Sequence, residues 1–359
     1  MAPSVREAME PYWTEHFMLP GQTHPGASAV AEAVEQAREQ VAKMVGCEGF
    51  EIVFTSGGTE ANNLAVLGLA KRYGGGHIVV SALEHESVWQ AVESLSPRTW
   101  RIDVAAVDSQ GRVDPKTLES LLREETRMVC VQLASPVLGA RQPIREIADL
   151  CHSHGIPLHC DATQAFGKIP VDIRTLRADT LALSAHKMYG PKGCGALYVR
   201  RGFSLAPVLY GESREMGLRP GSENVPAWVG FGAAAKLVDR CVTDAMARMH
   251  ELRDRLQDRL LSQISPAPRV LCQRADSLPN TLVMELEREI CRIARRARGV
   301  VFSMPRSLLP ADEGTRSLRA LGIGEAELRR CCSFSLGWTT SQEQIDTAAD
   351  LFAEAYDHG

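Results

Sequence analysis

The chain has 359 residues, of which 45% are hydrophobic and 23% are charged, and its formal net charge is −4. This length permits two domains, or one large α/β unit with a smaller appendage. The small negative charge argues against a nucleic-acid or membrane-surface partner, and no apolar run approaches the ~20 residues of a membrane span. The first seven residues lack the basic start and apolar core of a signal peptide, so we expect a cytoplasmic protein.

Helices and strands alternate through the first 200 residues. Apolar periodicity predicts helices over residues 4–15 and 27–46. Strands are then predicted at 51–55, 77–81, 127–133, 157–161, 180–184 and 195–200, with helices at 59–72, 86–95, 115–124 and 143–154. This alternation is typical of a mostly parallel sheet covered by helices on both faces.

The character of the sequence changes after about residue 235. A long charged helix is predicted through residues 245–256, and the stretch 265–268 contains two prolines and marks a turn or linker. Strand, helix, loop and a final helix follow, which indicates a smaller α+β domain. We therefore expect a large domain of residues 16–235 and a small domain formed by residues 1–15 and 236–359.

Two features outside this pattern bear on function. The arginine-rich run 288–298 suggests nucleic-acid binding, but Ile290, Ile293 and Ala297 recur at helical spacing, so we favour a solvated helix face. The ten cysteines are interpreted mostly as buried thiols, because several lie in apolar strand-like runs. No cysteine or histidine spacing makes a persuasive zinc site, and we expect no metal.

The first candidate for chemistry is a glycine-rich turn. Gly57 and Gly58 follow the predicted strand 51–55 and lead into a helical pattern. Such a turn offers backbone N–H groups and the positive end of a helix dipole to a phosphate. Thr59 is equally compatible with an ordinary helix cap.

Asp161 and Lys187 are the second and third candidates. Asp161 ends the predicted strand 157–161, and Lys187 follows the strand 180–184, so both are placed where open α/β sheets build their sites. Taken alone, Asp161 could be a helix cap and Lys187 a surface lysine. Together they match the needs of pyridoxal phosphate, whose ring nitrogen pairs with a carboxylate and whose aldehyde forms an imine with a lysine.

These three segments, in this order, resemble the cysteine desulfurases and selenocysteine lyases, a branch of the class V aminotransferase-like enzymes of fold type I, which use pyridoxal phosphate. The resemblance runs nearly end to end. It includes the runs Glu84-His85-Glu86-Ser87-Val88, 217–226 and Ser333-Phe334-Ser335-Leu336-Gly337, with Thr340 and Asp346 after the last of them. The family fold implies a mostly parallel seven-stranded sheet flanked by helices, with a smaller α+β C-terminal domain.

The resemblance also implies roles for single residues. Lys187 would be the Schiff-base lysine, His85 would stack on the cofactor ring, Asp161 would pair with the pyridine nitrogen, and Gln164 would contact the ring oxygen. The phosphate would be held by Gly58, Thr59, Ser184, His186 and, from the partner subunit of a homodimer, Ser222.

The departures from the family fall on substrate handling. An ungapped count places Ser307 where the family has its persulfide-forming cysteine, and no cysteine lies between Cys291 and Cys331. Pro136 replaces an asparagine that helps to hold substrate and cofactor. Trp338 replaces the arginine that grips the substrate carboxylate.

Two further points concern the substrate. The candidates for a replacement carboxylate clamp are Arg306, Arg214 and Arg219. A short N-terminal segment of the family has no counterpart before Met1; either the sequence starts late or that wall of the pocket is missing.

These observations predict a pyridoxal phosphate-dependent lyase that acts on an amino acid or amine, and we expect a sulfur-containing, cysteine-like substrate. It would work through an external aldimine and break a bond at Cα or Cβ without an enzyme persulfide, with Lys187 as general base. The alternatives are a decarboxylating or C–C bond-forming enzyme, a true cysteine desulfurase or selenocysteine lyase, and a non-catalytic scaffold in sulfur transfer.

Overall fold

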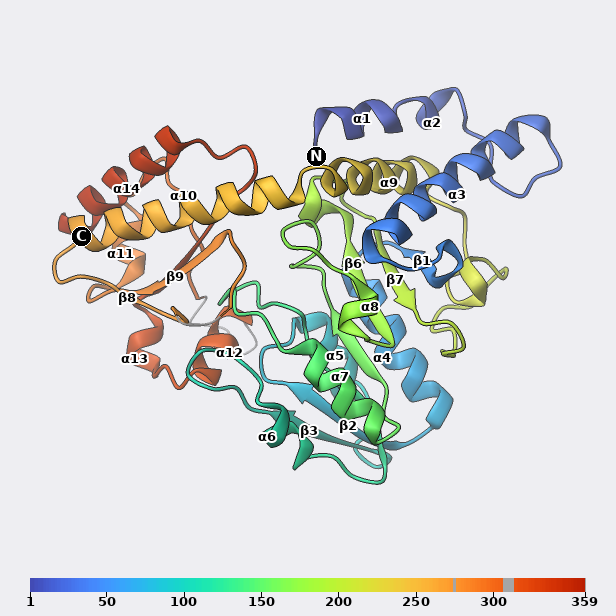
Figure 1. The fold of residues 1–359 in the computed structure, drawn as a ribbon, viewed down its shortest axis with the longest axis horizontal. Helices are drawn as coiled ribbons and strands as arrows, with labels where there is room; N and C mark the ends of the chain where they lie inside the picture. Colours follow the sequence, from blue (N-terminus) through green and yellow to red (C-terminus); the bar gives the residue numbers. More distant parts are fainter. Residues whose placement is uncertain (274–275, 306–312, 359) are drawn as a thin grey trace.

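The computed structural model describes residues 1–273, 276–305 and 313–358, and its centre is a seven-stranded sheet (Figure 1). The strands lie in the order β1 (Ile52–Thr55), β7 (Gly195–Val199), β6 (Thr180–Ser184), β5 (Leu158–Asp161), β4 (Thr126–Cys130), β2 (Gly76–Ser81) and β3 (Trp100–Ala105). All neighbours pair in parallel except β7, which is antiparallel to both β1 and β6. The predicted mostly parallel, seven-stranded sheet is confirmed.

The edge strand β3 was not predicted. Its residues alternate between polar and apolar, and Arg101 and Asp103 lie at its centre, so it lacks the continuous apolar run of a strand buried on both faces. Charged residues of this kind are common on edge strands, where they discourage pairing with a further chain.

Helices cover both faces of the sheet. On one face α3 (Pro25–Val45), α7 (Ile144–Ser153) and α9 (Val225–Asp239) share an apolar core with the strands. On the other face α4 (Gly58–Tyr73) and α5 (Glu86–Glu93) form a second core. The short helices α6 (Pro115–Glu119) and α8 (Ile173–Leu176) connect strands at the periphery. Because the strands are buried on both sides, the polar groups of a site are confined to the strand ends and the loops that follow them.

The chain begins with two short helices, α1 (Pro3–Met9) and α2 (Pro11–Thr14), where one helix was predicted over 4–15. Pro11 starts the second helix, because proline suits a first helical turn but interrupts a helix interior. Val5 and Met9 belong to the same core as Trp228 of α9. The first helix thus packs on the part of the chain that carries the large sheet, and the predicted domain boundaries stay a prediction.

A smaller α+β unit follows α10 (Val242–Gln263), the long helix that leads away from the large sheet in Figure 1. Its sheet has the order β10 (Cys331–Ser335), β9 (Thr281–Glu285) and β8 (Arg269–Val270), all antiparallel. Around it lie α11 (Ile290–Ala294), α12 (Glu313–Ala320), α13 (Glu325–Leu328) and α14 (Gln342–Asp357). One apolar cluster joins this unit to Leu83 and Leu138 of the large part, so the two units meet beside the ends of the large sheet.

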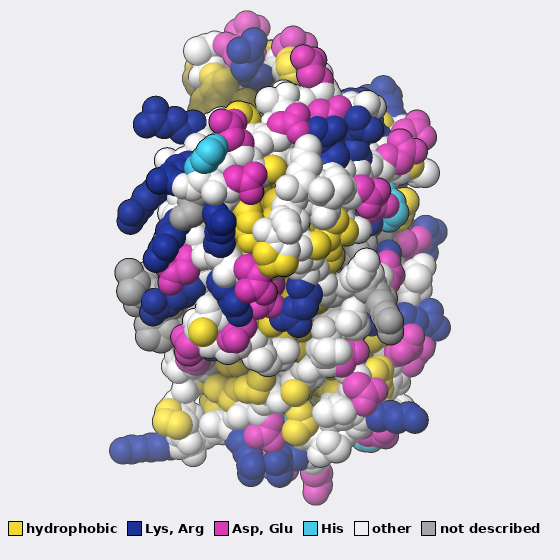
Figure 2. Space-filling view, turned by 90° about the vertical axis from the view of Figure 1, so that its left-hand side faces the viewer, with side chains coloured by type: hydrophobic (Ala, Val, Ile, Leu, Met, Phe, Trp, Pro, Cys, Tyr) yellow, Lys and Arg dark blue, Asp and Glu magenta, His cyan; other side chains and the backbone are white. Residues whose placement is uncertain are grey.

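The arginine-rich run, the surface charges and the cysteines can be compared with the sequence-based expectations. In the arginine-rich run, Ile290, Ile293 and Ala297 are buried, as the predicted helix face requires, although α11 spans only five residues. Figure 2 shows Lys and Arg interspersed with Asp and Glu on the face that carries the C-terminal unit. All ten cysteines are free thiols. Over the described ranges, no helix has the length and apolar character needed to cross a membrane.

Candidate active site

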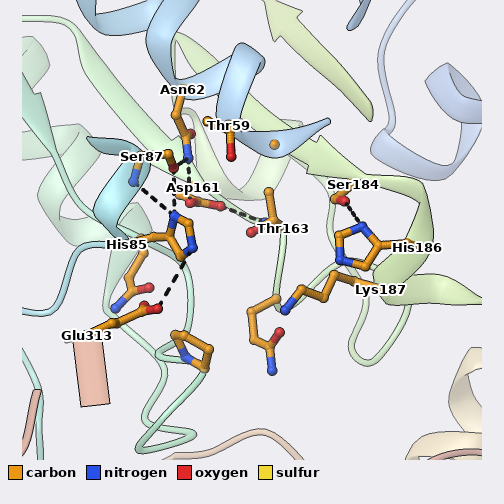
Figure 3. A pocket seen from close by; sticks show the side chains of 14 residues that line it. Thr59, Asn62, His85, Ser87, Asp161, Thr163, Ser184, His186, Lys187 and Glu313 are labelled. Atoms are coloured by element: carbon orange, nitrogen blue, oxygen red, sulfur yellow. Dashed lines mark hydrogen bonds and ion pairs between the residues drawn. The ribbon is translucent and has the colours of Figure 1, made fainter. Parts of the chain in front are cut away.

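A cavity of about 210 Å³ opens at the carboxyl ends of β5 and β6, and nine of the predicted site residues line it (Figure 3). The two strands are parallel neighbours, so the residues that end them, Asp161 and Ser184, lie at the same edge of the sheet. The predicted residues in the lining are Gly58, Thr59, His85, Pro136, Asp161, Gln164, Ser184, His186 and Lys187. Asn62, Ser87, Gln132, Thr163 and Glu313 complete it.

Lys187 lies in a 3₁₀ turn, Ala185–Met188, directly after β6. Ala185 and Met188 are buried and hold the turn against the core, while the side chain of Lys187 extends into the cavity. Ser184 Oγ and His186 Nδ1 are 2.8 Å apart beside it. Burial, aided by the charge of Lys187, lowers the pKa of His186, so this imidazole is neutral near pH 7.

Asp161 is held by donors on both of its carboxylate oxygens. Asn62 Nδ2 donates to Oδ2 at 2.7 Å, and the backbone N–H of Thr163 donates to Oδ1 at 2.8 Å. Asn62 in turn accepts a hydrogen bond from His159 Nε2 at 3.0 Å through its Oδ1. Burial lowers the pKa of His159 to about 4, so the ring is neutral and serves as a fixed donor. A carboxylate oriented in this way is suited to pair with a protonated ring nitrogen.

The first turn of α4 faces the same cavity from the other end. Within the described part of the chain, no side chain caps this helix, whose N-cap is Gly57, so backbone N–H groups of its first turn remain for an anion. A Cβ atom on Gly58 would lie 2.5 Å from Thr163 Cγ2, which explains why glycine occupies that position. Thr59 adds a hydroxyl group at the same end of the cavity, as Figure 3 shows.

His85 is the N-cap of α5, and this fixes its ring. The backbone N–H of Ser87 donates to Nδ1 at 3.0 Å, and Ser87 Oγ lies 2.7 Å from the same atom. Because Asn62 Nδ2 donates to Ser87 Oγ at 2.8 Å, the hydroxyl proton of Ser87 is directed to Nδ1. His85 is therefore positioned by the same network as Asp161.

Five lining residues were not predicted, and for some of them the sequence carried a signal. Asn62 lies four residues after Gly58, one helical turn further on the same face, and Ser87 stands two residues after the capping His85. Gln132 follows β4, whose end adjoins that of β5. Glu313 comes from α12 of the C-terminal unit, and only the three-dimensional fold brings it to the cavity.

A second cavity of about 290 Å³ adjoins the first and shares Pro136, Gln164 and Lys187 with it. Its other walls are mainly apolar and come from β9, β10 and α12, including Val283 and Leu318. No arginine lines either cavity among the described residues.

The other predicted substrate residues lie elsewhere. Trp338 lines neither cavity; its ring packs on Tyr189 at 4.4 Å. Arg219 pairs with Glu60 at 3.4 Å, and Arg214 pairs with Glu212 and Glu223. Ser222 is exposed on the loop that carries both arginines.

The remaining two predicted residues, Arg306 and Ser307, lie outside the described ranges. Their proposed parts in substrate binding and catalysis stay predictions from the sequence.

The residues of the first cavity fit pyridoxal phosphate. Lys187 supplies an amine, Asp161 supplies an oriented carboxylate, and α4 supplies an uncapped N-terminus for the phosphate. Gln164 Oε1 is buried at the cavity wall and has no hydrogen-bond partner among the described residues, so it is available to a polar group of a ligand. No cluster of three or more metal-ligating side chains occurs in the ranges that the structure describes.

Comparisons with known proteins agree with this site. The family model described as aminotransferase class-V matches residues 1–292. The cysteine desulfurase IscS 1 of Archaeoglobus fulgidus is 43% identical over 259 residues, which cover 72% of this chain and 68% of that protein. The cysteine desulfurase IscS of Methanosarcina thermophila is 34% identical over 98% of this chain and 88% of that protein.

Solved structures give the same result. A NifS-like protein superposes with a TM-score of 0.93 at 28% identity, over 100% of this chain and 97% of that one. A structure described as SspA in complex with cysteine has a TM-score of 0.83 at 32% identity, over 94% of this chain and 95% of that one. The chain therefore belongs to the aminotransferase class-V family of fold type I and is a pyridoxal phosphate-dependent enzyme with cysteine desulfurase homologues.

Proposed function

We propose that this enzyme cleaves the C–S bond of cysteine or a closely related sulfur-containing amino acid. The observation that carries the proposal is the cavity in which Lys187, Asp161, His85 and the first turn of α4 meet, in a chain similar over nearly its whole length to cysteine desulfurases. One structural relative is described as bound to cysteine, which supports the same class of substrate. The similarity favours desulfurase chemistry over a decarboxylating or C–C bond-forming reaction.

Different residues would hold different parts of the cofactor. When bound, pyridoxal phosphate supplies an aldehyde for the substrate amine and a ring that withdraws electrons from the substrate. Asp161 would hold a proton on the ring nitrogen, and the first turn of α4 with Thr59, Ser184 and His186 would bind the phosphate. A neutral His186 would take part as a hydrogen-bonding group rather than as a cation.

Lys187 would serve twice. Its Nζ atom would hold the aldehyde group of the cofactor and would also act as the base for the proton on the substrate Cα. The short turn that carries Lys187 has buried neighbours on both sides, and the Lys187 side chain extends into the cavity.

The two possible fates of the sulfur atom give different products. Transfer of sulfur to a thiol, as in a desulfurase, leaves alanine; release as sulfide leaves pyruvate and ammonia. The similarity to cysteine desulfurases supports transfer, yet the sequence offers no thiol between Cys291 and Cys331. Cys331 and Cys332 line the second cavity, but burial raises the pKa of both thiols, that of Cys331 to about 12, so both are poor nucleophiles there. An external thiol is therefore the acceptor we expect for the transfer route.

The test is product analysis with L-cysteine at saturating pyridoxal phosphate, with and without dithiothreitol, measuring alanine, pyruvate and sulfide. We expect C–S cleavage in the wild type and none in Lys187→Ala, which should also lose the borohydride-reducible yellow colour while remaining folded. Lys192→Ala is the matched control, because Lys192 is exposed in the same connection between β6 and β7 and lines neither cavity. If the wild type releases no alanine, pyruvate or sulfide from cysteine or its analogues, the proposal is wrong.

A further inference from the structure

Glu313 brings a carboxyl group from the C-terminal unit to the wall of the candidate active site. It is the first residue of α12, and its side chain is only 19% exposed. Its Oε2 lies 3.8 Å from His85 Nε2, and its Oε1 is buried with no hydrogen-bond partner among the described residues. Figure 3 shows the carboxyl group beside His85 at the cavity.

The position of Glu313 is fixed by Arg316, one helical turn further along α12. Arg316 Nη1 donates to Glu86 Oε1 at 2.6 Å, and Nη2 donates to the backbone carbonyl of Glu84 at 2.8 Å. These two bonds attach α12 to the residues on either side of His85. The distance between Glu313 and His85 is therefore set by an anchored helix rather than by a free loop.

The hydrogen bonds around His85 decide whether His85 or Glu313 is the group that can exchange a proton. Nδ1 accepts from the N–H of Ser87 and faces its hydroxyl, so in this ring the proton is on Nε2, the atom that faces Glu313. A second ring proton would have to displace the Ser87 donor from Nδ1. His85 is consequently suited to remain neutral and to donate from Nε2.

The electrostatics of the surroundings agree with this assignment. Burial raises the pKa of Glu313 to about 7, assisted by the charges of Asp161 and Glu86 and opposed by Arg316 and Lys187. Burial lowers the pKa of His85, and the positive charges of Lys187 and Arg316 lower it further. The negative charges of Asp161 and Glu86 act in the opposite direction. Near neutral pH the carboxyl group can thus carry a proton while the lowered pKa of His85 favours the neutral imidazole, which is the arrangement that general acid catalysis needs.

We propose that Glu313 is the general acid of C–S cleavage and that His85, whose Nε2 lies 3.8 Å from the Glu313 carboxyl group, is its fixed polar neighbour. This role rests on the proposed function. Heterolysis leaves the electron pair of the C–S bond on sulfur when sulfide is released, and on Cβ when sulfur passes to an attacking thiolate. In either route the atom that keeps the pair takes the proton of Glu313, and the resulting carboxylate is reprotonated from water. No oxidant or reductant is needed beyond the thiol of the transfer route.

The first measurement of this proposal is independent of turnover. Isotope-edited infrared difference spectra of the holoenzyme, prepared with ¹³C-carboxyl glutamate, would follow protonation of the band that disappears in Glu313→Gln. We expect a midpoint near the raised value of about 7. Replacing His85 with phenylalanine removes the Nε2 donor that favours the carboxylate, so the midpoint should rise further; an unchanged midpoint would refute the pairing.

The second measurement is the pH dependence of kcat for C–S cleavage. The wild type should lose activity as pH rises through the Glu313 titration, because the acid form is required. Glu313→Gln should lower kcat by about 100-fold, a typical contribution of general acid catalysis, and should lack this limb; Glu313→Asp should recover part of the rate. Glu325→Gln is the control, because Glu325 lies in the same unit, pairs with Arg319 and lines neither cavity.

The results of these measurements distinguish an error in the role of Glu313 from an error in the proposed function. A Glu313→Gln enzyme with wild-type kcat and an intact alkaline limb would overturn the role of Glu313 even if cysteine is cleaved normally. A wild type that cleaves no C–S bond would instead refute the proposed function and the catalytic role that depends on it. The infrared titration would then still decide whether the proton resides on Glu313.

Discussion

At the scale of single residues, the site depends on neutral polar groups behind the charged ones. The carboxylate of Asp161 is oriented by Asn62, Asn62 by His159, and His159 by Thr180, whose Oγ1 lies 2.9 Å from His159 Nδ1. A buried network of this kind is effective only when each member has its partner. The sequence pointed to Asp161 because a strand end and a distant lysine suggested a cofactor. Asn62, His159 and Thr180 had no such partner elsewhere in the sequence, so they were not predicted to belong to the site.

Glu84, next to His85, is a further buried carboxyl group with a measurable consequence. Its Oε1 accepts from the N–H of Gln132 at 2.6 Å, while its Oε2 is buried without a partner among the described residues. Burial raises the pKa of Glu84 to about 8, with Asp161 and Glu313 contributing. The folded protein therefore holds this proton more tightly than the unfolded chain does.

We predict that the stability of the wild type falls relative to Glu84→Gln as pH rises from about 5 to 8. In this window the unfolded chain has already lost the proton that the folded protein retains, so the free energy of unfolding decreases with pH. The difference should reach on the order of 3 kcal/mol and can be measured by urea unfolding of both proteins at several pH values. Parallel pH curves for the two proteins would show that Glu84 is ionised throughout.

At the scale of elements, α12 joins the two units at the candidate site. Arg316 also stacks on the ring of Trp89 at 5.1 Å, so one side chain contacts α5 through hydrogen bonds and through an aromatic face. Neither contact is visible in the sequence, because the partners lie more than 200 residues apart. Strands buried on both faces and helices with one apolar face were predictable, since their periodicity is local. The edge strand β3, the break at Pro11 and the approach of α12 were missed, because they depend on competing or distant contacts.

We predict that Arg316→Ala lowers kcat by roughly tenfold, because loss of the bonds to Glu86 and to the Glu84 carbonyl releases α12 from the loop that carries His85. The same change removes a cation that lowers the pKa of Glu313, so the titration of Glu313 should shift further upward. Infrared titration and pH–rate profiles would report both effects. Arg319→Ala is the comparison, because Arg319 lies on the same helix and pairs only with exposed Glu325 in the described structure.

At the scale of the whole molecule, Ser222 remains to be explained. It is exposed in the single chain and lines neither cavity, although the family resemblance assigns it to the phosphate. Both facts are compatible if Ser222 reaches the cavity of a second copy, as we propose for a homodimer. Apolar periodicity predicted the fold of one chain. It carries no information about a residue that would act in a neighbouring chain.

A mixed dimer tests this arrangement directly. Ser222→Ala should weaken cofactor binding by roughly ten- to a hundredfold, the scale of one hydrogen bond to a charged group. In a dimer of one Lys187→Ala chain and one Ser222→Ala chain, one site contains both an intact Lys187 and the partner's intact serine. Mixing and refolding the two variants should therefore restore cofactor binding to a fraction of sites. No restoration in a verified mixed dimer would place Ser222 in its own chain's site.

The attachment of α12 and the proton on Glu313 are two linked equilibria. Burial against the large unit raises the pKa of Glu313 to about 7, so the docked helix binds a proton more tightly than an undocked, solvated helix would. By thermodynamic reciprocity, a proton on Glu313 favours the docked helix. The hydrogen ion thus acts as a ligand that strengthens the junction between the two units, and mild acidification within the titration range of Glu313 holds the C-terminal unit more firmly over the cavity.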